Sequence, residues 1–231
     1  MIFDILTDSV RYAISKPKTI LILGVFNLFD FLVVPLLFAL GYYYKITKES
    51  TRGMINCDEK MPPLNNFKQL FIDGVKVLSA GLIYLIPPFV VFISLLFLSE
   101  LGYLEYDLVD PLSNCIFFIF FCYFYIALPN MAYHDSFKKA FDFKQINRII
   151  IKKIGVLPLI IVLLAINFME YIFGSISADI VQILNIIFSL DAVSLHALTF
   201  VFGTVMIALF ITPFIDVLLS RATGLLYVSD D

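Results

Sequence analysis

The feature that most constrains this chain is a set of long, uninterrupted apolar runs. A helix that crosses a lipid bilayer needs about 20 mostly apolar residues. Runs that reach or approach this length occupy residues 75–98, 112–133, 156–173 and 193–219. None alternates between apolar and polar residues as a strand of a transmembrane barrel does, and a helix satisfies its own backbone hydrogen bonds in lipid. The sequence therefore predicts four transmembrane helices.

The composition argues against a water-soluble fold. Hydrophobic residues make up 61% of the 231 residues, charged residues 15%, and the mean hydropathy is +0.95. Soluble domains are about half apolar and about one quarter charged. The predicted fold class is thus all-α, a polytopic transmembrane helical bundle that occupies residues 1–231 as a single membrane domain.

A fifth apolar window, residues 19–44, is interrupted by Asn27, Asp30 and Pro35. Its 26 residues are too few for two full crossings at about 1.5 Å per residue. We expect a re-entrant hairpin that turns near Asp30; the alternative is one crossing. We do not expect a cleaved signal peptide, because the run is too long and has no small-residue cleavage site.

The charges predict an orientation. No lysine or arginine lies in residues 99–111 or 174–191. Of the 16, Lys76 lies at the start of the window 75–98, and the other 15 lie in the other connecting segments and at the chain ends. Basic residues accumulate on the cytoplasmic side of short loops. The basic loops and the C-terminus are therefore expected in the cytoplasm of a multi-pass cell-membrane protein. A single crossing of the window 19–44 would instead give five spans with the N-terminus outside.

A shorter apolar stretch, residues 176–190, carries Asp179, Gln182 and Asn185. It is expected to be an interfacial or re-entrant piece, or an extension of a neighbouring helix. If it crossed the membrane, the protein would have six spans.

Three segments with helical amphipathic spacing precede apolar runs: residues 1–15, 66–78 and 143–154. We expect them to be cytoplasmic interfacial helices, the first within residues 1–16. The three units suggest a weak internal repeat; the alternative is that hairpins of any membrane protein look alike at this level. In the first, the expected apolar face holds Ile2, Leu6, Val10 and Ala13, with Asp4, Asp8 and Arg11 opposite.

The basic residues of these segments suggest a function at the cytoplasmic leaflet. Each base near a membrane surface can add about 1 kcal/mol of attraction to anionic lipid. The predicted function is non-enzymatic binding of membrane lipids or of a protein partner, with a homo-oligomer as another option. No cofactor, metal or nucleic acid is expected. The candidate lipid-binding residues are Lys68, Lys76, Lys144, Arg148, Lys152 and Lys153.

Two acidic residues inside apolar windows, Asp30 and Asp216, suggest an alternative. Charged groups within a membrane are costly and are by default candidates for a functional site. The rival prediction is a small transporter, or a transporter subunit, that uses polar groups in broken helices.

Four stretches carry a resemblance to a known family: VPLLFALGYYYKI (34–46), NNFKQLFIDGVKVLSAGLIYLIPP (65–88), PNMAYHDSFKKAFDFKQI (129–146) and RATGLLY (221–227). In this order and spacing they resemble an uncharacterised, mainly archaeal membrane-protein family, domain of unknown function 4013. The resemblance covers nearly the whole chain. It implies an integral protein of the cytoplasmic membrane and no particular activity. Many relatives have arginine where this chain has Lys45.

The most specific parts of the resemblance are Gly41, and Asp73, Gly74 and Lys76 within the segment LFIDGVK. Asp73 and Lys76 are three residues apart, a spacing at which helical side chains form an ion pair. Gly74 permits a bend or a close contact between helices.

Overall fold

Every element of the described structure is a helix. The structure is a computed structural model that describes residues 1–55, 59–188, 201, 203 and 205–229. The α-helices are α1 (Ile2–Ile14), α2 (Pro17–Leu28), α3 (Val33–Ser50), α4 (Phe67–Glu100), α5 (Val109–Tyr133), α6 (Phe143–Arg148), α7 (Val156–Phe188) and α9 (Thr212–Val228). Short 3₁₀ segments are η1 (Tyr106–Leu108) and η2 (Phe137–Phe141), and π-helical segments are η3 (Ile149–Ile154) and η4 (Ile207–Ile211).

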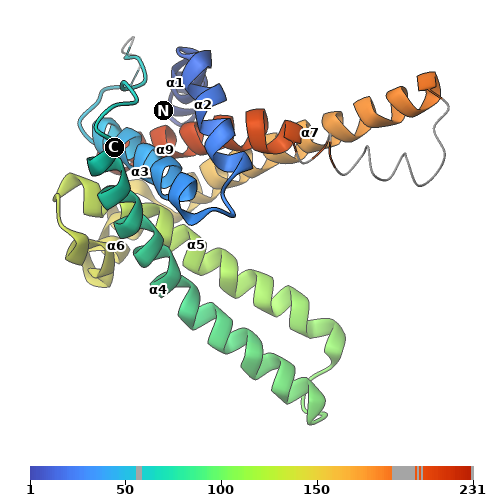
Figure 1. The fold of residues 1–231 in the computed structure, drawn as a ribbon. Coiled ribbons are helices and arrows are strands. Elements are labelled where there is room, and N and C mark those ends of the chain that lie inside the picture. The colour runs from blue at the N-terminus through green and yellow to red at the C-terminus, as the bar shows by residue number, and fades with distance from the viewer. Residues whose placement is uncertain (56–58, 189–200, 202, 204, 230–231) are drawn as a thin grey trace.

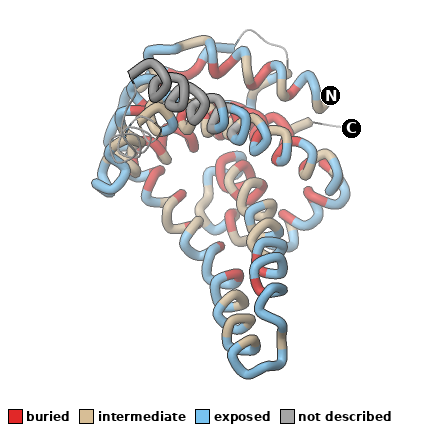
Figure 2. Tube along the Cα trace, turned by 90° about the vertical axis from the view of Figure 1, so that its right-hand side faces the viewer, coloured by how far each residue is buried: buried red, intermediate tan, exposed pale blue. Residues whose placement is uncertain are grey.

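Two apolar projections leave the body of the molecule in different directions (Figure 1). One is the antiparallel pair α4 and α5, and the other is α7. Figure 2 shows that the outer part of the α4–α5 pair is largely exposed. The exposed side chains there include Leu82, Ile86, Phe97 and Ile119. Soluble monomers rarely expose apolar patches of more than a few hundred Å², so this surface is suited to lipid.

Three helices are long and apolar enough to cross a membrane: Phe67–Glu100, Tyr106–Tyr133 and Ile207–Val228. A bent pair, Phe143–Ile154 and Val156–Met169, meets the same test of length and composition and would be a fourth.

Several predicted windows differ from the observed helices in their extent. Helix α4 begins at Phe67, so residues 67–78 of the predicted interfacial segment 66–78 are the first part of this long helix. Helix α7 continues past residue 173 to Phe188, so residues 176–188 extend a neighbouring helix; residues 189 and 190 lie outside the described structure. Most of residues 193–204 also lie outside it. The described part of that window continues beyond residue 219 to Val228.

The apolar window of residues 19–44 is divided by a turn at residues 29–32, between α2 and α3. Phe29 N–H donates to Phe26 O, and Leu32 N–H donates to Phe29 O. Pro35 lies in the first turn of α3, where its missing N–H leaves no helical hydrogen bond unmade. Asp30 lies in the turn and is exposed.

Helix α3 lies at the centre of the body and crosses α4 with the two backbones in direct contact. A Cβ atom added at Gly41 would overlap the carbonyl of Leu70, and one at Gly74 would overlap the carbonyl of Leu37. Each helix therefore presents a glycine to the other, which allows the helices to approach more closely than side chains permit.

Helix α1 packs against α9 through a face other than the expected one. Its buried residues are Ile5, Asp8, Ser9, Tyr12 and Ala13. Of the predicted apolar face only Ala13 is buried, and Ile2, Leu6 and Val10 are half-buried. The predicted placement of Asp8 on the polar face is wrong, because this carboxylate has a buried cationic partner on α9.

A bend of 91° separates the helical stretch Phe143–Ile154 from Val156–Met169. The residue between them, Gly155, has φ = 85°, a conformation that side chains with a Cβ rarely adopt. The two parts of the chain thus leave this glycine nearly at right angles.

Candidate functional site

Three basic residues lie along the exposed side of the helical stretch before the bend. We call Lys144, Arg148 and Lys152 the basic face; all three are exposed. They are spaced by four residues, which places them on one side of a helix. Among the described residues none of the three forms an ion pair. Their charges are therefore available to a ligand.

The opposite side of this stretch is packed into the core. Ile146, Ile149, Ile150 and Ile154 are buried. Phe143 and Ile151 are exposed beside the basic face, at 50% and 58%. The segment therefore combines free basic residues with exposed apolar side chains, a combination typical of helices that lie in a membrane interface.

Asp142 is the N-cap residue of helix α6, and its carboxylate accepts a hydrogen bond of 3.1 Å from the backbone N–H of Gln145. Such a cap satisfies one of the free N–H groups of the first turn. Lys139 Nζ donates to the other Asp142 oxygen at 2.9 Å and to Gln145 Oε1 at 2.8 Å. Together the cap and this hydrogen bond lower the pKa of Asp142.

The segment η2 before α6 is anchored directly to α4 and α5, and through α5 to α9. Tyr84 on α4 donates to the carbonyl of Ala140 at 2.7 Å, and Asn130 on α5 donates to that of Lys139 at 2.7 Å. Tyr227 on α9 donates to Asn130 Oδ1 at 2.8 Å. These buried hydrogen bonds fix where the basic face begins.

The other predicted lipid-binding residues do not join the basic face. Lys68 is exposed at the start of α4. Lys76 forms an ion pair of 2.9 Å with Asp73. Lys153 is half-buried, with Nζ 5.9 Å from the centre of the Tyr227 ring. The six predicted residues thus divide between α4 and the stretch before the bend.

The family motif occupies the crossing of α3 and α4. Asp73 is 8% exposed and accepts from Lys76 Nζ and from Gln69 Nε2, both at 2.9 Å. The neighbouring Gly74 contacts α3, and Gly41 of α3 contacts α4. The motif glycines therefore bring the backbones of α3 and α4 into contact, and the ion pair between Asp73 and Lys76 lies beside this contact within α4.

Asp30 and Asp216 line one cavity, although they are 186 positions apart in the sequence. We call it the polar cavity after these two acids, and its volume is about 370 Å³. Its other lining residues are polar (Asn27, Tyr43 and Thr212) and apolar (Leu36, Ala39, Leu40, Ile207 and Ala208). It lies where the turn after α2 meets η4 and the start of α9. Asn27 Nδ2 donates to the Tyr43 hydroxyl at 3.2 Å, and Tyr43 also interacts with Asp216. The sequence singled out both acids but gave no sign that they line one cavity.

A buried charged cluster around Arg221 was missed by the sequence reasoning. Arg221, 1% exposed, donates through Nε to Asp8 at 2.9 Å and through Nη1 to Glu59 at 2.6 Å. Its guanidinium carbon lies 4.7 Å from the centre of the Tyr12 ring. The available signal was an arginine in an apolar helix without an acid three or four residues away. Such a residue needs a partner from another segment.

An ion pair also links α3 to the end of α5. Lys48 Nζ lies 2.6 Å from Asp135 Oδ1, and this contact lowers the pKa of Asp135. Asp135 has φ = 50°, a left-handed conformation that aspartate and asparagine tolerate better than most residues.

Comparison with known proteins identifies a family for most of the chain. Residues 27–178 match the model of a family described as "Protein of unknown function (DUF4013)". The match includes the segment LFIDGVK, the basic face and Asp30, whereas Asp216 and Arg221 lie outside it. No curated protein and no solved structure matches the chain.

Proposed function

The chain belongs to the DUF4013 family, whose description assigns no activity, and we propose from its geometry that it is a non-enzymatic membrane protein that binds anionic lipid headgroups. The binding site is the basic face of α6 and η3. The observation that carries this proposal is the 91° bend at Gly155, which joins the basic face to an apolar helix. Three helices long and apolar enough to cross a membrane are consistent with a membrane protein.

The bend supports the proposal through simple geometry. The segment before the bend turns away from α7 by 91°, so it does not follow α7 into a membrane and would instead lie along the membrane surface. Lys144, Arg148 and Lys152 would then lie at the level of the headgroups, and Phe143 and Ile151 would reach the acyl boundary. With about 1 kcal/mol for each base, the three would contribute about 3 kcal/mol of attraction.

The charge distribution supports a cytoplasmic location for this site. The loop between α4 and α5 carries Glu100, Glu105, Asp107 and Asp110 without any base. The basic face lies at the other end of α5, so a membrane crossed by α4 and α5 separates the two. By the positive-inside rule, the side with the basic face is the cytoplasm.

We also propose that α2 and α3 form a re-entrant hairpin that enters from the same side. The 12 residues of α2 span about 18 Å, which is well short of a hydrocarbon core of about 30 Å. Phe31, Leu32 and Val33 near the turn are exposed, as expected of a tip that contacts lipid. Asp30 is exposed and lines the polar cavity together with Asn27 and Thr212.

The test is lipid retention by the purified full-length protein. Native mass spectrometry should show bound phosphatidylglycerol in preference to phosphatidylcholine. The variant K144E/R148E/K152E should lose that preference. A matched control, R11E/R52E/K60E, makes the same change in net charge at three exposed bases elsewhere and should keep it. Raising the salt concentration should weaken retention by the wild type, because exposed charges are screened. Equal retention by all three proteins would refute the proposal.

A second candidate function, transport, is favoured by the polar cavity. The cavity brings Asp30 and Asp216 together beside a break in an apolar window, as at the broken helices of transporters. Its test is flux into proteoliposomes. Uptake of a tested ion or solute by the wild type, lost in Asp30→Asn, would support transport. No flux in the wild type for any solute tested would count against it.

A further inference from the structure

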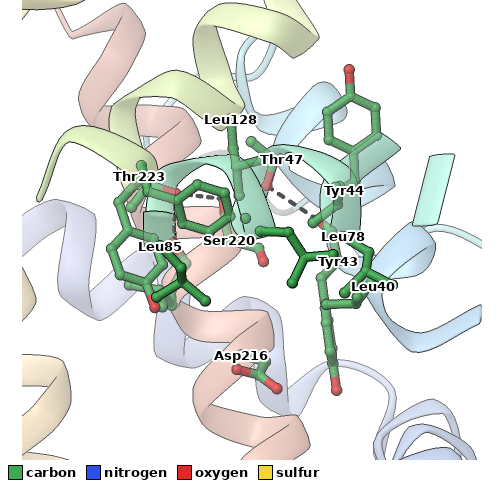
Figure 3. Close-up of a pocket in the computed structure, with 16 residues that line it drawn as sticks. Leu40, Tyr43, Tyr44, Thr47, Leu78, Leu85, Leu128, Asp216, Ser220 and Thr223 are labelled. Atoms are coloured by element: carbon green, nitrogen blue, oxygen red, sulfur yellow. Dashed lines mark hydrogen bonds between the residues drawn. The ribbon is translucent and has the colours of Figure 1, made fainter. Parts of the chain in front are cut away.

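A second cavity adjoins the polar cavity. It is bounded by α3, α4, α5 and α9 and has a volume of about 230 Å³ (Figure 3). We call it the apolar cavity, because most of its lining is hydrocarbon or aromatic: Leu78, Leu82, Leu85, Phe124 and Leu128.

The two cavities share part of their walls. Leu40, Tyr43 and Asp216 line both. Figure 3 shows the Asp216 carboxylate and the hydroxyl end of Tyr43 at one end of the apolar cavity, away from the Tyr44 hydroxyl. A molecule at Asp216 therefore meets both carboxylates on one side, among polar and apolar neighbours, and the leucines and Phe124 on the other.

The chemistry of the two sides defines a ligand class. Asp30 and Asp216 attract a positive charge, and Asn27 and Thr212 supply further oxygen atoms around it. The leucines and Phe124 favour a hydrocarbon group. The ring of Tyr43, between them, is a surface on which substituted ammonium groups bind well. A small inorganic cation would leave the apolar cavity unused, and a neutral lipid would leave the two carboxylates unused.

We propose that the adjoining cavities form one binding site for an amphipathic cation, with an ammonium group at Asp30 and Asp216 and a hydrocarbon group in the apolar cavity. The site is separate from the basic face and does not depend on lipid headgroup binding. It is also independent of transport, since binding does not require that the ligand cross the membrane.

The experiment measures binding of octyltrimethylammonium to the full-length protein in nanodiscs of phosphatidylcholine. Empty nanodiscs provide the background from partition into lipid. Octyl sulfate carries the same chain with the opposite charge, and tetramethylammonium carries the same head without the chain. Phosphatidylcholine has no net charge, so the basic face does not contribute, and K144E/R148E/K152E should bind the probe as the wild type does.

Carboxylate and chain are tested separately. Asp216→Asn should weaken binding of octyltrimethylammonium at least tenfold. Asp30→Asn should weaken binding by a smaller factor, because Asp30 is exposed and its charge is screened by water. Since the side chain is exposed, this variant is also expected to fold normally. The matched control Asp107→Asn alters an exposed acid distant from both cavities and should have no effect. Leu78→Trp fills the apolar cavity and should reduce the advantage of octyltrimethylammonium over tetramethylammonium from at least tenfold to less than threefold.

Three results would overturn the proposal. The first is that octyl sulfate binds as tightly as octyltrimethylammonium. The second is that both aspartate variants bind octyltrimethylammonium like the wild type. The third is that Leu78→Trp still binds octyltrimethylammonium at least tenfold more tightly than tetramethylammonium. Thermal unfolding of each variant identifies loss of the fold, and Asp30→Asn keeps the proposal testable if Asp216→Asn does not fold.

Discussion

Arg221 provides the sharpest test of how this fold is held together. Replacing it with methionine keeps an unbranched side chain of similar length but removes the charge and all the hydrogen bonds. The variant loses contacts with two acids that differ in exposure: Asp8 is 6% exposed, whereas the Glu59 side chain is 39% exposed. Without the guanidinium, Glu59 can turn into water, but Asp8 stays in the interface between α1 and α9.

The magnitude follows from this difference. Removing one partner of a buried ion pair costs about 3–5 kcal/mol, because the charge that stays buried loses a buried counter-ion. Removing a partner of an exposed pair costs about 0.2–1 kcal/mol. We therefore expect Arg221→Met to destabilise the protein by about 3–5 kcal/mol, and Glu59→Gln by less than about 1 kcal/mol. Since most of the loss comes from Asp8, the double variant D8N/R221M should be more stable than Arg221→Met alone.

The assay is unfolding by denaturant in detergent micelles, monitored by circular dichroism, for the wild type and these variants. Arg221→Lys is a further control, because lysine keeps the charge but cannot contact Asp8, Glu59 and the Met54 carbonyl at once. Its stability should lie between those of the wild type and Arg221→Met. A loss of less than 1 kcal/mol in Arg221→Met, or an equal loss in Glu59→Gln, would refute the reasoning.

Three other predictions concern packing, pH and orientation. Gly41→Ala should destabilise the protein by about 1–3 kcal/mol through overpacking, while Gly203→Ala, whose Cβ meets open space, should not; unfolding curves would compare them. Asp135→Asn should lower stability by less than about 1 kcal/mol at pH 7. Because the folded pKa of Asp135 is lowered, this difference should shrink as the pH falls below about 4 and vanish below the lowered pKa; equal differences at pH 3 and 7 would contradict it. On intact cells, an impermeant thiol reagent should label a cysteine at Glu105 but not one at Lys139; equal labelling would overturn the orientation.

The apolar helices could be predicted from sequence because burial in lipid leaves a local signal, namely a long run without charges. The residues at which each helix begins and ends were harder to predict. Asp179 and other polar residues left open whether residues 176–190 form a separate piece or extend a neighbouring helix, and residues 176–188 continue α7. Single polar residues cost a helix little and do not end it.

The site could be predicted only in its separate parts. Asp30 and Asp216 stood out individually, because each interrupts an apolar window. Their shared cavity depends on how the turn after α2 packs near η4, which no local pattern records. Asp8 was wrongly predicted to lie on the exposed face of α1 for the same reason. Amphipathic spacing predicts that a charged residue is exposed, because it contains no information about a partner on a distant helix. The family motif pointed to Gly41 and Gly74, but only the structure pairs each with the backbone opposite.

The contact between Asp8 and Arg221 joins residues 213 positions apart, and this separation has a consequence for biosynthesis. At about 5–20 residues per second, the ribosome adds Arg221 roughly 10–40 s after Asp8. Helix α1 emerges first but cannot make its buried ion pair until α9 has been synthesised. The first helix of the chain is therefore among the last to reach its final place, and a chain truncated before α9 cannot secure it.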